Sequence, residues 1–221
     1  MKLMFSNLSQ PIEFQEGFVY SLIIENQTLF RTLLEDLYNQ TNKFEGFCVL
    51  SVNNTPIEID KYVELITSYV PFDINQKRFL NKILGELEKL SLDATNYLTT
   101  QQIIADIEKY IDELSFDLGL EIELSKLTFS NLLKSVGILI SEDYEQPLEN
   151  LLNFFDIVLD LDKDKLFITV NLRSYYNDQE LKPFINTVIN KKIKLLMIET
   201  YEHPLLDNES RTLIDSDLCE I

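Results

Sequence analysis

Two short apolar stretches decide how this chain folds: Lys165-Leu-Phe-Ile-Thr-Val-Asn171 and Ile193-Lys-Leu-Leu-Met-Ile-Glu199. Each has the length and the apolar, partly β-branched content of a buried strand. The segment between them has a helical pattern, and strand–helix–strand is the crossover unit of a parallel sheet. We therefore expect an α/β fold built on a mostly parallel sheet.

The residue at the end of the first of these strands, Asn171, bears on whether the protein can hydrolyse a nucleotide. In nucleotide hydrolases with this layout, the corresponding strand often ends in a carboxylate that holds magnesium, whereas this chain has Asn171. No Gly-x-x-x-x-Gly-Lys-Ser/Thr sequence is present to form a phosphate-binding loop. The pattern predicts the layout of a phosphate-binding fold without the parts that perform hydrolysis, and so favours a binding protein or a scaffold.

Length and composition indicate one sizeable core with long continuous elements. The chain has 221 residues, of which 45% are hydrophobic, and only five are glycine and six proline. No apolar run of signal-peptide length follows Met1, and no window approaches the roughly 18 apolar residues that span a bilayer. We expect a cytoplasmic protein without a membrane-embedded part, in which Cys48 and Cys219 are reduced.

Two long helical patterns lie in the middle of the chain, over 76–92 and 99–116, and each has one apolar stripe. Such a pair is expected to pack antiparallel across its short connection. Strand and helix patterns precede and follow this region: the first part reads as strand 18–24, helix 26–38 and strand 47–52, and the last part begins with a strand at 138–140. The sequence therefore predicts a head domain made of residues 1–75 and 138–221, with a helical leg at 76–137.

The net charge of −18 produces an average field that repels nucleic acid and anionic membranes. The charge is unevenly distributed, because basic residues outnumber acidic ones over 162–195 and acidic residues dominate 101–150. On the first leg helix, Lys77, Arg78, Lys82 and Lys89 are mixed with Glu86 and Glu88. That pattern is typical of an ion-paired solvent face, and less often of a strip that binds phosphates. No base-reading motif is present, so any DNA contact would be with phosphate and shape.

Acidic residues gather around the expected end of the second leg helix. Glu113 and Asp117 are four residues apart on one helical face, and Glu121 and Glu123 share a face of the extended segment after Gly119. Oxygen ligands converging from two segments suit calcium, although no EF-hand loop is present, and the alternative is a solvated acidic face. The single histidine, His203, has no partner with which to form a zinc site and is expected to be a loop residue.

Several segments together resemble one known family. They are Met1-Lys-Leu-Met-Phe-Ser-Asn-Leu-Ser-Gln-Pro-Ile, Pro71-Phe-Asp-Ile-Asn, Leu132-Leu-Lys-Ser-Val-Gly-Ile, Lys165-Leu-Phe-Ile-Thr-Val-Asn and Leu213-Ile-Asp-Ser-Asp. In order and spacing they resemble the CRISPR-associated adaptation protein of type II-A systems. That family forms rings that bind double-stranded DNA ends during spacer acquisition in antiviral defence.

The resemblance implies a head that resembles a degenerate P-loop NTPase fold, a helical leg, and a homotetrameric ring with a basic central hole. It also implies calcium ions held by carboxylates, which favours Glu113, Asp117, Glu121 and Glu123 as ligands, and no catalytic activity. Its partners would be double-stranded DNA, the CRISPR integrase complex and the RNA-guided effector nuclease. In a ring, four copies of one basic strip face a common axis, which reconciles DNA binding with the acidic chain. The residues expected to contact phosphates are Lys134, Lys77, Arg78 and Lys82.

Two other functions stay open on the sequence. One is a divergent nucleotide-binding hydrolase whose phosphate site uses other residues. The other is a protein-interaction scaffold that does not bind DNA, which the net charge of −18 favours.

Overall fold

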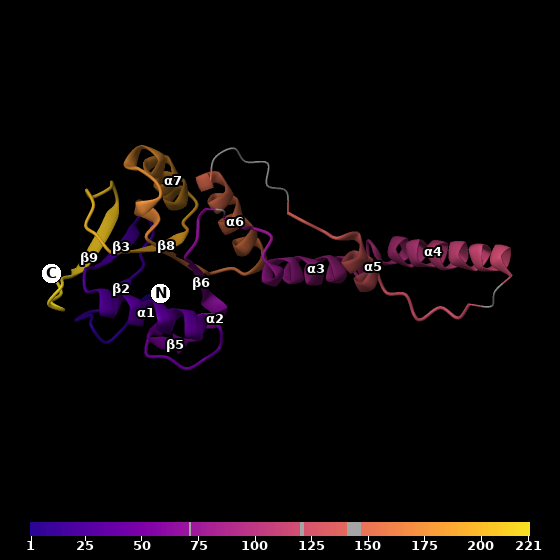
Figure 1. Ribbon diagram of the computed structural model, residues 1–221, viewed down its shortest axis with the longest axis horizontal. Coiled ribbons are helices and arrows are strands. Elements are labelled where there is room, and N and C mark those ends of the chain that lie inside the picture. Colours follow the sequence, from indigo (N-terminus) through magenta and orange to yellow (C-terminus); the bar gives the residue numbers. More distant parts are fainter. Residues whose placement is uncertain (71, 120–121, 141–146) are drawn as a thin grey trace. The chain divides into compact units, whose positions relative to one another are not determined.

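The computed structural model describes residues 1–70, 72–119, 122–140 and 147–221, without the side chains of Arg78 and Pro147 (Figure 1). The chain divides into two compact units. The first consists of Met1–Phe72 and Tyr144–Ile221, and the second of Asp73–Asp143. All the strands of the described residues belong to the first unit, whereas the second contains only helices and connecting segments. Among the described residues, no helix is long and apolar enough to cross a membrane.

A five-stranded sheet forms the centre of the first unit, with the strand order β6-β7-β8-β3-β9. Its strands are β6 (Val63–Ile66), β7 (Leu166–Val170), β8 (Lys194–Glu199), β3 (Val19–Ile24) and β9 (Glu209–Ile214). Every pair of neighbours is parallel. The expected α/β fold with a mostly parallel sheet is therefore confirmed, and the apolar stretches 165–171 and 193–199 contain the adjacent strands β7 and β8.

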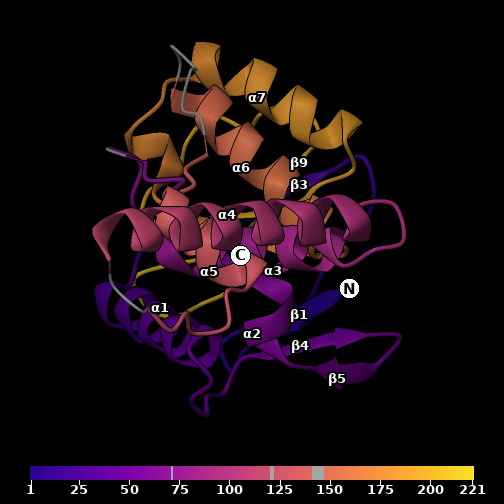
Figure 2. The ribbon, with the colours of Figure 1, turned by 90° about the vertical axis from the view of Figure 1, so that its right-hand side faces the viewer.

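Helices cover both faces of this sheet, α1 (Gln27–Thr41) on one side and α6 (Pro147–Leu161) and α7 (Asp178–Asn190) on the other (Figure 2). Side chains alternate between the faces along each strand. Ile168 belongs to the core that includes Leu33 of α1. The adjacent Phe167 stacks on Phe155 of α6, with ring centroids 4.1 Å apart. Burial on both faces explains why these strands are continuously apolar in sequence.

A second, antiparallel sheet has the order β2-β1-β4-β5 and is followed by the short helix α2 (Ile59–Tyr62). Its strands are β1 (Lys2–Met4), β2 (Ile12–Glu13), β4 (Val49–Val52) and β5 (Thr55–Ile57). The expected strand–helix–strand elements form as β3, α1 and β4, but they are not a parallel crossover unit, because β4 pairs with β1 and not with β3. Asn53 and Asn54 adopt φ of 51° and 60°, a turn that sends the chain back into β5 as a hairpin.

A buried aspartate fixes the approach to β4. Asp36 of α1 accepts hydrogen bonds from the backbone N–H of Phe47 (2.9 Å) and of Cys48 (3.0 Å), and from the Gln40 amide (2.7 Å). Burial alone would raise the pKa of Asp36, but these donors outweigh it and lower that pKa. The loop between α1 and β4 is therefore held against the helix.

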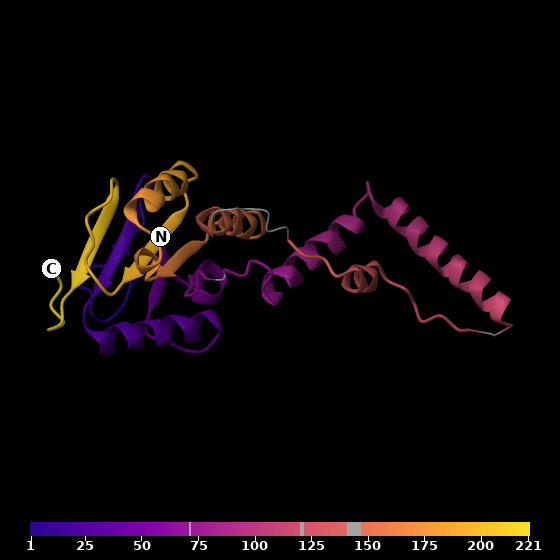
Figure 3. The same ribbon diagram turned by 45° about the horizontal axis from the view of Figure 1, so that its top comes forward.

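The second unit contains α3 (Lys77–Ser91), α4 (Tyr97–Leu118) and α5 (Phe129–Val136). Among the described residues, α3 packs against α5, and α4 diverges from α3 after their connection (Figure 3). The expected antiparallel packing of the two long helices is therefore wrong. The residue that follows α3, Leu92, keeps right-handed helical angles, whereas Gly119 and Gly137 end α4 and α5 in the left-handed conformation that reverses a chain.

The strand expected at residues 138–140 is not formed. The Asn75 side chain occupies both backbone groups of Ile140: its Oδ1 accepts from the Ile140 N–H (2.7 Å) and its Nδ2 donates to the Ile140 carbonyl (3.1 Å). These two hydrogen bonds bring the start of α3 close to the segment that leaves α5. As a result, the α3–α5 pair is closed at this end by side-chain hydrogen bonds rather than by a sheet.

Candidate functional site

The carboxyl edge of the five-stranded sheet is the first place to look for a ligand site. From β3 the chain runs through α1 to the far edge strand β6, whereas from β8 it passes to the opposite edge, β9. In open parallel sheets, ligands bind outside the carboxyl ends of strands where such connections diverge. The place in question lies between β3 and β8.

In this protein the chain itself fills that place. Only Glu25 and Asn26 link β3 to α1. Asn26 Oδ1 accepts from the N–H groups of Thr28 (3.1 Å) and Leu29 (3.0 Å), and its Nδ2 donates to the Ser216 carbonyl (2.9 Å). First-turn N–H groups are the donors that hold phosphate in nucleotide-binding proteins. Here two of those donors are already satisfied by an asparagine.

Asn171, expected in place of a metal-binding carboxylate, has a structural role. It adopts φ of 53° after β7, and its Oδ1 accepts from the backbone N–H and the hydroxyl of Thr200, both at 3.1 Å. Its own N–H donates to the Ile198 carbonyl at 2.8 Å. The amide therefore joins the ends of β7 and β8, and its side-chain oxygen is used within the protein.

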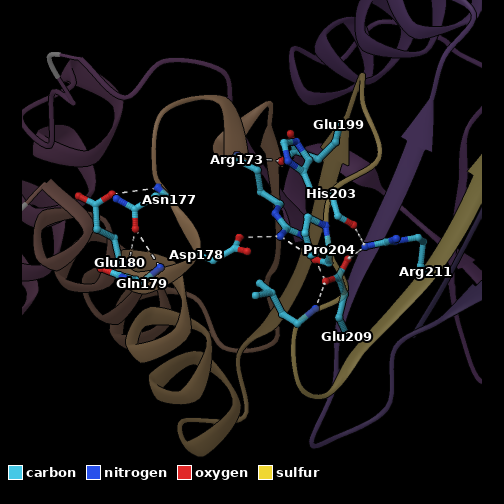
Figure 4. A network of polar contacts seen from close by, with 11 residues as sticks. Arg173, Asn177, Asp178, Gln179, Glu180, Glu199, His203, Pro204, Glu209 and Arg211 are labelled. Carbon is cyan, nitrogen blue, oxygen red and sulfur yellow. Dashed lines mark hydrogen bonds and ion pairs between the residues drawn. The ribbon is translucent and has the colours of Figure 1, made fainter.

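A network of buried charges lies beside this edge, around Arg173 of the 3-10 helix η1 (Leu172–Ser174) (Figure 4). The guanidinium Nη1 donates to Glu209 Oε2 at 3.3 Å, and Nη2 donates to Asp178 Oδ1 and to the Pro204 carbonyl, each at 2.8 Å. The Arg173 side chain is 2% exposed. Arg173 thus connects η1, the first turn of α7, the loop that follows β8, and β9.

Glu209 is held from two sides. Its Oε2 also accepts from the Leu206 N–H (2.8 Å), and its Oε1 accepts from Arg211 Nη2 (3.2 Å). Arg211 in turn donates to the His203 carbonyl (2.7 Å) and to Glu202 (3.0 Å). A buried carboxylate with two arginines and a backbone donor is well compensated.

Glu199, at the end of β8, is less well compensated. Its Oε1 accepts from the Arg173 backbone N–H at 3.2 Å, and its buried Oε2 has no hydrogen-bond partner within the described structure. Burial raises the pKa of Glu199 to about 7, against the lowering effect of Arg173. We did not predict this network from the sequence, although a glutamate that ends a buried apolar strand is a signal of it.

His203 lies in the loop after β8, as expected. Its Nε2 is buried and has no hydrogen-bond partner within the described residues. Burial, together with the positive charge of Arg173, lowers its pKa. His203 lines an open groove of about 450 Å³ with Arg173, Tyr176, Asp178 and others, but none of these is placed as a nucleophile beside it.

The residues expected to contact DNA are carried by two helices that pack together. Lys77, Arg78 and Lys82 lie on α3 and Lys134 lies in the last turn of α5. Lys77 and Lys134 are exposed. Neither has an ion pair within the described residues, whereas in the first unit Lys191 pairs with Asp156 (2.5 Å) and Lys192 with Glu16 (2.8 Å). The Asn75 bonds tie the start of α3, where Lys77 lies, to Ile140, which follows α5 in the chain.

The residues expected to bind calcium are only partly described. Glu113 and Asp117 are exposed on α4, and Glu113 pairs with Lys109 at 3.8 Å. Glu123 is exposed in a segment without regular structure, and Glu121 lies outside the described residues. Within the described part of the chain, no three carboxylate, histidine or cysteine side chains gather as they would around a metal ion.

One face of α4 is apolar and exposed. Ile103, Tyr110 and Leu114, spaced seven and four residues apart, are 42%, 60% and 44% exposed. With Leu118, which is 69% exposed, we call this set the α4 apolar face. A helix that exposes such a stripe usually buries it against another chain.

These features define an α/β protein in which side chains of the chain itself occupy the carboxyl edge of the parallel sheet. This sheet domain is joined to a helical unit that leaves lysines and an apolar face exposed. The model of the CRISPR-associated protein family Cas_Csn2 matches residues 40–218. A CRISPR-associated protein Csn2 from Enterococcus faecalis is 22% identical over 202 residues, which cover 90% of each chain. The chain therefore belongs to the Csn2 family of type II-A CRISPR-associated proteins, which confirms the resemblance found in the sequence.

Proposed function

We propose that the protein binds the ends of double-stranded DNA without regard to sequence, as a non-catalytic homotetrameric ring, during the acquisition of new CRISPR spacers. The CRISPR integrase complex and the RNA-guided effector nuclease would be its partners. Family membership supports the CRISPR-associated role. The observation that carries DNA binding is the exposure of Lys77 and Lys134, without ion pairs among the described residues, on two helices that pack together.

Assembly is required by the charge of the chain. With a net charge of −18, a single chain presents an average field that repels a polyanion, and two lysines cannot overcome it. Four copies of the α3–α5 pair around one axis would concentrate the positive charge in a hole of duplex size. The α4 apolar face supplies a surface through which copies can associate without using these lysines.

Calcium is the cation proposed for the acidic residues of the second unit. The donor set of Glu113, Asp117, Glu121 and Glu123 consists only of carboxylate oxygens, the ligands that calcium prefers. Glu113 and Asp117 lie one turn apart on α4 and are open to solvent. These residues would hold the ion, and its positive charge would offset the negative carboxylates of the second unit and favour assembly.

The layout of the first unit is that of a degenerate P-loop NTPase in this proposal. The parallel order β6-β7-β8-β3-β9, with β3 leading directly into α1, supports it. The self-capped start of α1 disfavours the alternative of a working nucleotide hydrolase, because Asn26 already accepts from the donors that a phosphate needs.

The test of the proposed function compares DNA topologies. A closed ring admits duplex only by threading from an end, so linear fragments should bind and covalently closed circles of the same sequence should bind poorly. Cutting the circle once should restore binding, which controls for sequence and length. Equal affinity for both forms would contradict threading. No binding to either form, with an intact tetramer, would favour a scaffold that does not bind DNA.

A further inference from the structure

Arg173 has a limited number of donors, and most of them are occupied. Its two terminal nitrogens bond Glu209, Asp178 and the Pro204 carbonyl, and its backbone N–H bonds Glu199. Among its guanidinium nitrogens, Nε is buried and has no partner within the described residues. The contact with Pro204 is the one by which Arg173 holds the loop of residues 200–208.

The unpartnered Nε of Arg173 has a natural complement nearby. Glu199 accepts from the Arg173 backbone N–H through Oε1, and its Oε2 is buried without a partner in the described structure. One residue therefore carries an unused buried donor, and a residue hydrogen-bonded to it carries an unused buried acceptor. A buried carboxylate oxygen that no donor reaches is costly in the ionised form, so this arrangement favours the neutral carboxyl group.

The charged and titratable groups around Glu199 come from every element that packs near it. Arg173 comes from η1, Asp178 from α7, His203 from the loop after β8, and Glu209 and Arg211 from β9. Tyr69, which follows β6, donates its hydroxyl to the Ile66 carbonyl and remains neutral because burial raises its pKa. Glu209 already uses both arginines, so an ionised Glu199 adds a second buried carboxylate that lacks a cation of its own.

We propose that protonation of Glu199 controls how firmly the 200–208 loop is held, and we call this arrangement the latch. When Glu199 is neutral, Arg173 holds the loop to the first turn of α7. When Glu199 is ionised, it draws Arg173 away and the loop loosens. In the structure the guanidinium is bound to Glu209, Asp178 and the Pro204 carbonyl, the arrangement that the proposal assigns to the neutral form. After proton loss, rotation of the guanidinium brings Nε toward Glu199 Oε2, and the 2.8 Å bond to the Pro204 carbonyl breaks.

Because proton binding by Glu199 is linked to folding, the pKa shift sets the direction in which stability changes with pH. Burial raises the pKa of Glu199 from 4.5 in the unfolded chain to about 7 in the folded one. Between these values the folded protein binds more protons, so its stability falls as pH rises from 4.5 through 7. The latch is therefore closed in mild acid and opens across neutral pH.

The experiment measures hydrogen exchange of the loop at pH 5.5 and pH 8.5, corrected for intrinsic rates. In the natural protein, the protection factor of residues 200–208 should fall by roughly tenfold at the higher pH, while protection in α1 stays constant. The Arg173 Nε–H resonance should shift with the same midpoint. In Glu199→Gln, whose amide mimics the neutral acid, both pH effects should disappear.

Two variants serve as matched controls. Glu64→Gln removes another buried glutamate, which is paired with Lys165 at 3.7 Å, and His203→Gln removes the nearby histidine. Both should retain the pH effect on the loop. If the effect persists in Glu199→Gln or disappears in His203→Gln, the latch is wrong. If Glu199→Gln does not fold, the carboxyl carbon of Glu199 can be titrated in the natural protein, and a midpoint below pH 5.5 overturns the proposal.

Discussion

The first unit, which contains the two sheets, and the second unit, which contains α3, α4 and α5, differ in how they bury apolar side chains. We call them the sheet unit and the helical unit. In the sheet unit Phe155, Phe167 and Leu196 are completely buried, and helices cover both faces of the parallel sheet. In the helical unit, α4 exposes the α4 apolar face. The first unit is complete within one chain, whereas the second has the properties of an element that is completed by association.

Charge follows the same division. The buried cations Lys165 and Arg173 of the sheet unit are compensated within the chain: Lys165 lies 3.2 Å from Asp162 and Arg173 lies 2.8 Å from Asp178. The helical unit leaves Lys77, Lys134 and Asp117 exposed and without ion pairs among the described residues. The exposed charges of the helical unit are therefore open to a ligand or a partner, whereas those buried in the sheet unit stabilise its fold.

The largest expected effect is a loss of core packing in the sheet unit. Phe155→Ala should lower the free energy of unfolding by about 3–5 kcal/mol, because Phe155 is fully buried between Phe167 and Phe184. Phe116→Ala on α4, where the ring is 87% exposed, should change it by less than about 0.5 kcal/mol. Denaturant-dependent hydrogen exchange reports each unit separately. A comparable cost for both variants would remove the contrast between the units.

The next effect concerns assembly. The protein should have the mass of four chains by light scattering at micromolar concentration. The double variant Ile103→Glu with Leu114→Glu places charge in the middle of the α4 apolar face and should release single chains, with α7 still protected from exchange.

A matched variant, Gln101→Glu with Gln102→Glu, adds the same charge to exposed positions of α4 and should remain assembled. A natural protein that runs as one or two chains would contradict the ring. Dissociation of the matched variant would show that net charge, and not the apolar face, controls association.

The sequence predicted the core of the sheet unit because a buried strand is apolar at every position. Residues 165–171 and 193–199 contain β7 and β8, and the helix between them is α7. The strand expected at residues 47–52 also forms, as β4, but its partner was not predicted, because strand content is visible in a sequence and the choice of partner is not. β4 pairs with β1, and the Asp36 contacts with Phe47 and Cys48 hold the loop that leads into it.

Contacts between polar residues that are distant in the chain could not be predicted from the sequence either. Lys77 and Lys134 could be proposed as basic residues, but only the packing of α3 on α5 places their helices together. The Arg173–Glu209 pair joins residues 36 positions apart through a loop that has no periodic pattern. Periodicity identifies an element and its faces, whereas a polar network requires the fold.

Measuring the DNA affinity of variants in each unit tests whether the helical unit is the one that binds DNA. Lys134→Glu should weaken binding to every sequence by roughly tenfold or more and leave the tetramer intact, because a lysine that neutralises a phosphate reads no sequence information. The dependence of log K on log salt should become shallower by about 0.9 for each phosphate that is no longer neutralised. Lys163→Glu makes the same charge change at an exposed position of the sheet unit and should bind normally. Full binding by Lys134→Glu would show that another residue lines the hole.

The smallest expected effect is that of calcium, and it should be confined to the helical unit. At about ten times its Kd, a bound ion stabilises the folded state by about 1.4 kcal/mol, which corresponds to a Tm shift of several degrees for a unit of this size. Chelation removes this contribution and leaves the carboxylates of Glu113 and Asp117 to repel each other. Hydrogen exchange in α4 should therefore accelerate on chelation while exchange in α7 does not change. Glu113→Gln with Asp117→Asn should lose the response, and Glu45→Gln, an exposed acid of the sheet unit, should keep it. If exhaustive chelation changes neither Tm nor α4 exchange, calcium has no part in holding the leg, and the acidic residues of α4 are a solvated face.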